Sequence, residues 1–270
     1  MPIIEPFVRW AGGKSWLIPY LTQLVSSIKF NHFHEPFLGG GAVFLALDHE
    51  RTAYLSDINE DLINAYKEIK NNYIQVINIL HAYKNTEEDY YRIRSLILDD
   101  PIERAARFIY LNHTSYNGLY RVNKLGNYNV PYGRRKKINY NETKLKIISL
   151  KLQKANLKCG DFEINKYAIK KKDLVFLDPP YTVSHNNNGF IEYNKTLFSL
   201  DDQIRLSNFI EYIKHKEAYY ILTNAAHPKI KEIFGKENMP IVLQRNSLIG
   251  GKNSKRQKIE EYIFTNIERG

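Results

Sequence analysis

The apolar run LVFL at Leu174–Leu177, together with the tetrapeptide DPPY that follows it, constrains the fold more than any other feature of the sequence. Four consecutive apolar residues are typical of a central parallel strand, which is buried on both faces of its sheet. The two prolines end the strand, because they lack N–H donors and keep the residues before them out of helical backbone. In an open α/β sheet, ligands bind beyond the carboxyl ends of the strands, which is where Asp178 falls.

Strand and helix patterns alternate at both ends of the chain, which predicts an α/β fold. Short apolar runs indicate further strands at residues 30–35, 53–57, 219–222, 241–243 and 262–264. A long amphipathic helix is expected after Asn59, which is placed as its N-cap.

Helical pattern continues as far as Ile97 and returns at residues 105–111, whereas strand pattern is absent from this part of the chain. We therefore expect a helical domain at residues 61–145, inserted into a catalytic domain made of residues 1–60 and 146–270.

The chain carries 39 Lys and Arg residues against 29 Asp and Glu residues, a formal net charge of +10. Such an excess favours a polyanionic partner, because Lys and Arg contacts to phosphate release condensed counterions. A solvated basic surface explains the same charge, so the net charge alone does not distinguish a protein with a polyanionic partner from one without.

Several classes of protein are excluded by composition. The single cysteine, Cys159, excludes an internal disulfide and is expected to be a small buried residue rather than a nucleophile. The scattered histidines predict no metal site. The N-terminus lacks a signal-peptide pattern and no run reaches membrane-spanning length, so a cytoplasmic protein is expected.

The DPPY loop offers hydrogen-bond acceptors and no donors around Asp178. A guest with two N–H donors, such as the N6 amine of adenine, is complementary to it, and Tyr181 offers an aromatic face for a flipped base. A rigid turn after a strand, with Asp178 as a helix cap, is the alternative.

A glycine-rich loop, EPFLGGG at residues 35–41, lies between a predicted strand and a predicted helix. Glycines there let the backbone approach a bound nucleotide closely. The loop is not a dinucleotide fingerprint, because Phe44 stands where the third glycine is required. Asp57, at the end of the next strand, can accept hydrogen bonds from ribose hydroxyls or serve as a helix cap.

The segment 112–137 interleaves amide, guanidinium and aromatic side chains and ends in a basic run. This combination suits the reading of base edges together with phosphate contact, although a plain polar loop is the alternative.

These motifs, in this order, resemble the DNA adenine methyltransferases of the GATC-methylating (Dam-like) type over nearly the whole chain. The resemblance implies a Rossmann-like class I methyltransferase sheet, with an inserted helical DNA-recognition domain carrying a β-hairpin. It implies that the catalytic residues are Asp178, Pro179, Pro180 and Tyr181. It also implies that S-adenosyl-L-methionine is bound by Trp10, Ala11, Gly12, Gly13, Lys14, Glu35, Pro36, Phe37, Gly39, Gly41, Asp57, Ile58, Asp161, Phe162 and Asp178.

The segment from Tyr116 to Gly133 is similar to the family's target-recognition hairpin. An arginine at the place of Arg121 reads a guanine there, and a basic residue at the place of Arg9 contacts the flanking G·C pair. The resemblance thus implies duplex DNA as partner and GATC as target. The implied DNA-binding residues are Arg9, Tyr116, Asn117, Leu119, Arg121, Asn123, Pro131, Arg134 and Lys136.

The resemblance further implies a monomer in the cytoplasm of a bacterium, or of a phage's host, with any cognate restriction nuclease not stably bound. Three alternatives stay open. An N4-cytosine methyltransferase shares the chemistry, although Ser is commoner than Asp at position 178. An RNA or protein-glutamine methyltransferase uses similar proline loops. A catalytically silent DNA-binding protein would keep only the fold.

Overall fold

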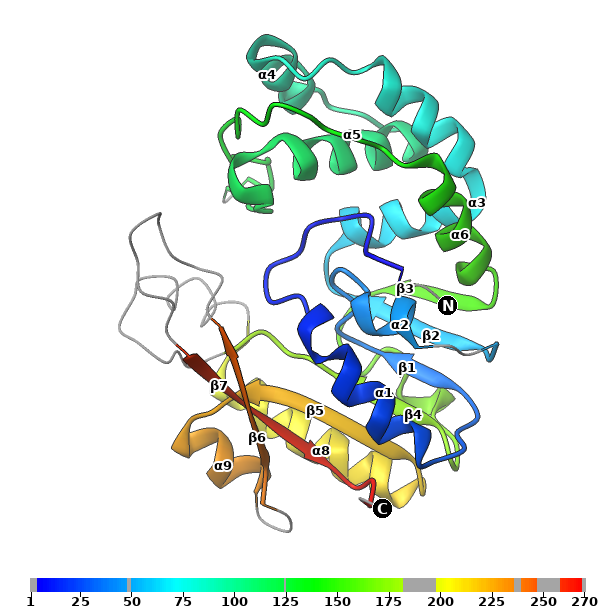
Figure 1. Ribbon diagram of the computed structural model, residues 1–270, viewed down its shortest axis with the longest axis vertical. Helices are drawn as coiled ribbons and strands as arrows, with labels where there is room; N and C mark the ends of the chain where they lie inside the picture. The colour runs from blue at the N-terminus through cyan, green and yellow to red at the C-terminus, as the bar shows by residue number, and fades with distance from the viewer. Residues whose placement is uncertain are drawn as a thin grey trace. The chain divides into compact units, whose positions relative to one another are not determined.

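The computed structural model describes residues 4–47, 50–123, 125–181, 198–235, 239–246 and 258–268. The chain forms two compact units, Met1–Ile18 with Leu38–Ile164, and Pro19–Phe37 with Asn165–Gly270. Helices and strands occur in both (Figure 1), and three of the five described strand pairings are parallel. The mixed α/β fold with a helical segment is therefore confirmed. The predicted division at residues 61–145 stays a prediction.

In the first unit, β2 (Ala53–Asp57) pairs in parallel with β3 (Ala155–Cys159), with Asp57 opposite Cys159. The sequence predicted β2 but not β3. Only the first residue of β3 is buried, so no apolar run marks the strand. Cys159 is exposed, so the expectation that it is buried was wrong.

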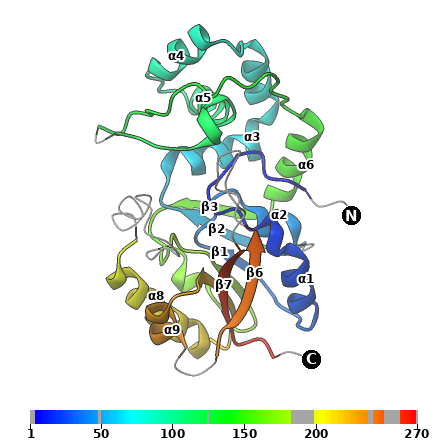
Figure 2. The same ribbon diagram turned by 60° about the vertical axis from the view of Figure 1, so that its left-hand side comes forward.

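Most of the regular secondary structure in the described part of the first unit is helical. The helices there are η1 (Ser15–Leu17), α2 (Ala42–Ala46), α3 (Glu60–Ala82), α4 (Glu87–Ser95), α5 (Pro101–Thr114), η2 (Tyr116–Gly118) and α6 (Glu142–Leu152). The helix α3 packs along α5, and α6 lies against α3 (Figure 2). As predicted, Asn59 caps α3, since its side chain accepts the N–H of Leu62. The helical pattern expected to reach Ile97 ends earlier, because α4 stops at Ser95 and Ile97 is exposed.

The segment after α5 folds back on itself. We call its described part, residues 115–123 and 125–133, the arm. Its two halves run side by side (Figure 2), joined by antiparallel bridges between Ser115 and Tyr132 and between Val122 and Tyr128. Within the described residues, the expected hairpin is thus present as two isolated antiparallel bridges and not as a pair of regular strands.

In the part of the second unit that the structure describes, the strands lie in the order β1 (Phe33–Glu35), β4 (Leu174–Leu177), β5 (Tyr219–Ala225), β7 (Lys258–Thr265) and β6 (Ile241–Asn246). The first three are parallel, whereas β7 runs antiparallel to both of its neighbours. All four residues of β4 are buried, as predicted. Among the described residues, the helices that accompany these strands are α1 (Ile18–Ser26), η3 (Lys166–Ala168), α8 (Leu200–His215) and α9 (Pro228–Phe234), and α8 packs on β5 (Figure 1).

A buried carboxylate fixes the loop that enters β4. Asp173 accepts the N–H groups of His32 (3.0 Å) and Lys170 (2.9 Å) and is hydrogen-bonded to Nε2 of His34 at 2.9 Å. Burial opposes ionisation of Asp173, but the hydrogen bonds from His34, Lys170 and His32 outweigh it and lower its pKa. Burial lowers the pKa of His34, against the opposing effect of Asp173, so a neutral ring donates to an ionised carboxylate.

Replacing this carboxylate should destabilise the protein. We expect Asp173→Ala to lower the free energy of unfolding by about 2–4 kcal/mol, because buried N–H donors lose their acceptor. Because the folded-state pKa of Asp173 is lowered, its contribution is full at neutral pH and is lost as the pH falls below about 4. Urea denaturation at several pH values measures the difference. The control Glu217→Gln removes an exposed ion pair with Lys171 and should change stability by less than about 0.5 kcal/mol. An equal effect of the two changes would contradict this account.

Candidate active site

The glycine-rich loop is shaped to lie against Trp10. Gly39 and Gly41 have φ values of +48° and +65°, in the left-handed region that favours glycine. A Cβ on Gly39 would lie 2.7 Å from Cδ1 of Trp10, and one on Gly41 would lie 2.6 Å from the Tyr66 hydroxyl oxygen. Side chains at these two positions would therefore push the loop away from its neighbours.

Asp57, at the carboxyl end of β2, holds this loop in place. Its carboxylate accepts the N–H of Gly39 at 2.9 Å and the N–H of Asn59 at 3.0 Å. Burial raises the pKa of Asp57, against the lowering effect of these N–H donors. The side chain of Ile58 is 76% exposed beside it, which leaves an apolar surface next to a carboxylate.

The other predicted cofactor residues divide between the two units. The N–H of Gly160 donates to the carbonyl of Asp57 (3.0 Å), which brings the exposed Asp161 and the buried Phe162 to the end of β2. Ala11, Gly12 and Gly13 are exposed, whereas Lys14 is buried and donates to the Gly12 carbonyl at 2.8 Å.

Glu35, Pro36 and Phe37 belong to the second unit. Glu35 is buried, and the Phe37 ring packs edge-on against Phe198, with 5.6 Å between the centroids. These three residues thus lie in a different unit from the glycines that follow them.

The DPPY tetrapeptide, predicted to be catalytic, is held by residues from the strands β5 and β7 of the second unit. Oγ1 of Thr223, buried in β5, donates to Oδ1 of Asp178 at 2.7 Å. The hydroxyl of Tyr181 donates to Oε2 of Glu261 in β7, also at 2.7 Å. Pro179 is buried and Pro180 is half-buried. The described start of the loop after β4, residues 178–181, is therefore fixed at both of its polar side chains, Asp178 and Tyr181.

Arg9 and the turn at the start of the arm are joined by Asn112. The buried side chain of Asn112 accepts the main-chain N–H of Arg9 (2.7 Å) and donates to its carbonyl (2.8 Å). Gly118 has a φ of +67°, and a Cβ there would lie 2.6 Å from Cδ of Arg9. Arg9 itself is exposed, so its charge faces solvent next to the arm.

Arg121 is exposed on the arm and is oriented by Asn129, since its Nε donates to Oδ1 of that residue at 2.7 Å. Asn123 has a different setting, because its Oδ1 accepts the N–H groups of Leu125 and Asn127 and so shapes the turn. Most of the other predicted DNA-binding residues are exposed, namely Tyr116, Asn117, Pro131 and Lys136. Leu119 is half-buried, and Arg134 is exposed and lies 3.6 Å from Glu87.

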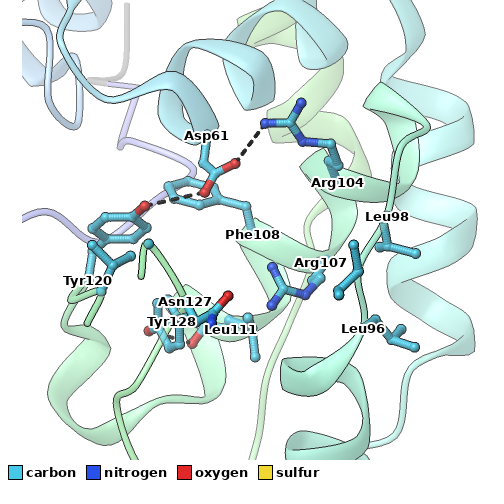
Figure 3. Close-up of a pocket in the computed structure, with 13 residues that line it drawn as sticks. Asp61, Leu96, Leu98, Arg104, Arg107, Phe108, Leu111, Tyr120, Asn127 and Tyr128 are labelled. Atoms are coloured by element: carbon cyan, nitrogen blue, oxygen red, sulfur yellow. Dashed lines mark hydrogen bonds and ion pairs between the residues drawn. The ribbon is translucent and has the colours of Figure 1, made fainter. Parts of the chain in front are cut away.

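A cavity of about 150 Å³ lies between α5 and the arm (Figure 3). Asp61 on its wall accepts hydrogen bonds from Arg104 (3.1 Å) and from the Tyr120 hydroxyl (3.3 Å). Tyr120 also stacks on Trp10, with 5.7 Å between ring centroids and 29° between ring planes. Trp10 therefore contacts both the glycine loop and the arm.

Thr223 and Glu261 contact the tetrapeptide, and Nε of Arg245 donates to Oε1 of Glu261; none of the three was predicted from the sequence. They lie far along the chain from Asp178, and no motif surrounds them. The signal that could have found them is the polar residue within an apolar strand, as in YYILTNA of β5.

Among the described residues, no three or more His, Cys, Asp and Glu side chains are grouped so as to hold a metal ion. None of the described helices combines the length and the apolar character needed to cross a membrane.

Comparison with known proteins places this chain in a family. Residues 10–248 match the family model of the D12 class N6 adenine-specific DNA methyltransferases. The chain is 36% identical to type II methyltransferase M1.LlaDCHI of Lactococcus lactis subsp. cremoris, over 97% of this chain and 95% of that protein. It is 37% identical to type II methyltransferase M.MjaIII of Methanocaldococcus jannaschii, over 86% and 87% respectively. It is 32% identical to the DNA adenine methylase of Escherichia coli K12, over 95% and 93%.

The family match spans most of the chain, and the three relatives match over most of their own lengths. Membership of this family implies that DNA is the substrate and that methyl transfer depends on S-adenosylmethionine. Adenine is thereby favoured over cytosine, RNA and protein substrates, and an enzyme over a silent DNA-binding protein. The chain belongs to the D12 class of N6 adenine-specific DNA methyltransferases.

Proposed function

We propose that the protein transfers the methyl group of S-adenosyl-L-methionine to N6 of adenine within GATC in duplex DNA, after the target base has rotated out of the helix. The observation that carries the proposal is the setting of Asp178. Its carboxylate stands at the carboxyl end of β4, is oriented by the Thr223 hydroxyl at 2.7 Å, and is followed by two residues without N–H donors.

The loop after β4 suits an amine as its guest. The Asp178 carboxylate and the Pro179 carbonyl are acceptors, and adenine N6 carries two N–H donors. Accepting both hydrogens orients the nitrogen lone pair and raises its electron density as positive charge develops on it. Tyr181 supplies an aromatic face against which the flipped base stacks. The transfer then gains mainly from positioning, and no covalent enzyme intermediate is needed.

The cofactor-binding residues of the proposal fit a nucleoside with a charged tail. The glycine loop exposes main chain beside Trp10, Asp57 offers carboxylate oxygens for ribose hydroxyls, and Ile58 offers an apolar surface for the adenine ring. When bound, S-adenosylmethionine supplies a methyl group activated by the sulfonium. The Rossmann-like class I sheet, and the assignment of residues 61–145 to DNA recognition, are part of the same proposal.

The arm supplies the proposed contacts to DNA. Arg121 is exposed, and Asn129 accepts from its Nε at 2.7 Å and from its Nη2 at 3.3 Å, so the other N–H groups of the two Nη atoms can point at a base edge. A bidentate contact to O6 and N7 of guanine discriminates against the wrong base by about 1–3 kcal/mol. Arg9, clamped beside the arm, is placed to contact the flanking G·C pair.

Removal of the Asp178 carboxylate should abolish the chemical step. We expect Asp178→Ala to lower kcat by about 100-fold or more, because the acceptor for N6 is lost, with little change in DNA binding. Single-turnover transfer of labelled methyl groups and separate binding titrations measure the two effects. The control Asp201→Ala removes an exposed carboxylate from α8 and should leave kcat unchanged. Near-normal turnover by Asp178→Ala would contradict the mechanism.

Arg121 should determine the response to guanine N7. We expect the wild-type kcat/KM to fall by about 10-fold when 7-deazaguanine, which lacks N7, replaces guanine in GATC. The kcat/KM of Arg121→Ala should be low, and equally so, on the duplex with guanine and on the duplex with 7-deazaguanine. As a matched comparison, Lys136→Ala should weaken binding to all sequences and reduce its salt dependence. If Arg121→Ala responds to 7-deazaguanine as the wild type does, Arg121 does not read the guanine.

A further inference from the structure

A buried carboxylate lies in the C-terminal strand of the second unit. Glu261 is 1% exposed and stands in β7 opposite Leu243 of β6 and Ala225 of β5. Removing a carboxylate from water costs free energy unless charges and hydrogen bonds compensate. Glu261 receives such compensation at each of its two oxygens.

The two oxygens have different partners. Oε1 accepts from Nε of Arg245 on the neighbouring strand β6, and Oε2 accepts from the Tyr181 hydroxyl at 2.7 Å. The adjacent Glu260 points to the opposite face of β7, where it is exposed and pairs with Gln244 at 3.1 Å. Only one of two consecutive glutamates therefore reaches the catalytic loop.

A buried ion pair adds little to stability by itself, since apolar residues of the same volume often serve as well. The Glu261–Arg245 pair differs because it has a third member, Tyr181, 80 residues away along the chain and within the catalytic tetrapeptide. Burial raises the pKa of Tyr181, and the charges of Asp178 and Glu261 raise it further. The hydroxyl therefore stays protonated and remains a donor to Glu261.

We propose that Glu261, a carboxylate paired in charge with Arg245, is a positioning residue for methyl transfer. It accepts a hydrogen bond from the Tyr181 hydroxyl and so fixes the plane of the Tyr181 ring. The inference rests on the proposed function, in which that ring stacks on the target adenine. A hydrogen bond to an ionised acceptor is short and directional, so it restricts rotation of the ring. Stacking and in-line attack both depend on such alignment.

The experiment is a double-mutant cycle on the full-length protein, with Tyr181→Phe, Glu261→Gln and the double variant. Tyr181→Phe removes one oxygen and leaves the Glu261–Arg245 pair in place, so it is the variant expected to fold like the wild type. We expect it to lower the single-turnover methylation rate by at least about 5-fold, with DNA and cofactor dissociation constants unchanged. In the Tyr181→Phe background, Glu261→Gln should have no further effect on the rate.

The matched control is Glu260→Gln, which should leave the rate unchanged. A wild-type rate for Tyr181→Phe, or additive effects in the double variant, would overturn the inference. Tyr181→Ala separates this outcome from failure of the proposed function. If Tyr181→Ala is inactive while Tyr181→Phe is fully active, the ring is needed but its hydroxyl is not, and only the inference fails. If Tyr181→Ala is also fully active, the proposed stacking role is wrong.

Discussion

The burial of β4 between two parallel neighbours fixes the position of Asp178, where the proposed chemistry takes place. Its four apolar residues are all buried; all four pair with β5 on one side, and Leu174 and Val175 pair with β1 on the other. The strand ends at Leu177, just before Asp178, because the two prolines that follow cannot continue the ladder. The same pairing sets Thr223 of β5 beside the Asp178 carboxylate. Hydrophobic burial of the strand thus places a carboxyl group at a defined point.

In the first unit, aromatic and main-chain contacts position the residues of the candidate site. Trp10 lies against Gly39 and stacks on Tyr120, so the glycine loop and the arm share one ring. Arg9, the residue before Trp10, is held at its main chain by two hydrogen bonds with the side chain of Asn112. Residues that the proposal assigns to cofactor and to DNA therefore lie within one packed cluster of that unit.

Local patterns in the sequence predicted the parts of the fold that depend on neighbouring residues. The apolar run of β4 and the N-cap at Asn59 are confirmed, because burial and capping leave their mark within a few residues. The strand β3 and the exposure of Cys159 escaped prediction, since an edge strand carries few apolar side chains. Partners such as Glu261 depend on the register between distant strands, which composition and spacing do not encode. The roles of the individual site residues stay predictions.

Base-resolved methylation mapping tests the central claim most directly. Unmethylated genomic DNA is incubated with the purified protein and S-adenosylmethionine, and every modified base is located. The account predicts N6-methyladenine at GATC and at no other sequence. N6-methyladenine in a different motif would contradict the role of Arg121 while keeping the chemistry. N4-methylcytosine, or unmodified DNA despite bound cofactor, would contradict the role assigned to the Asp178 loop.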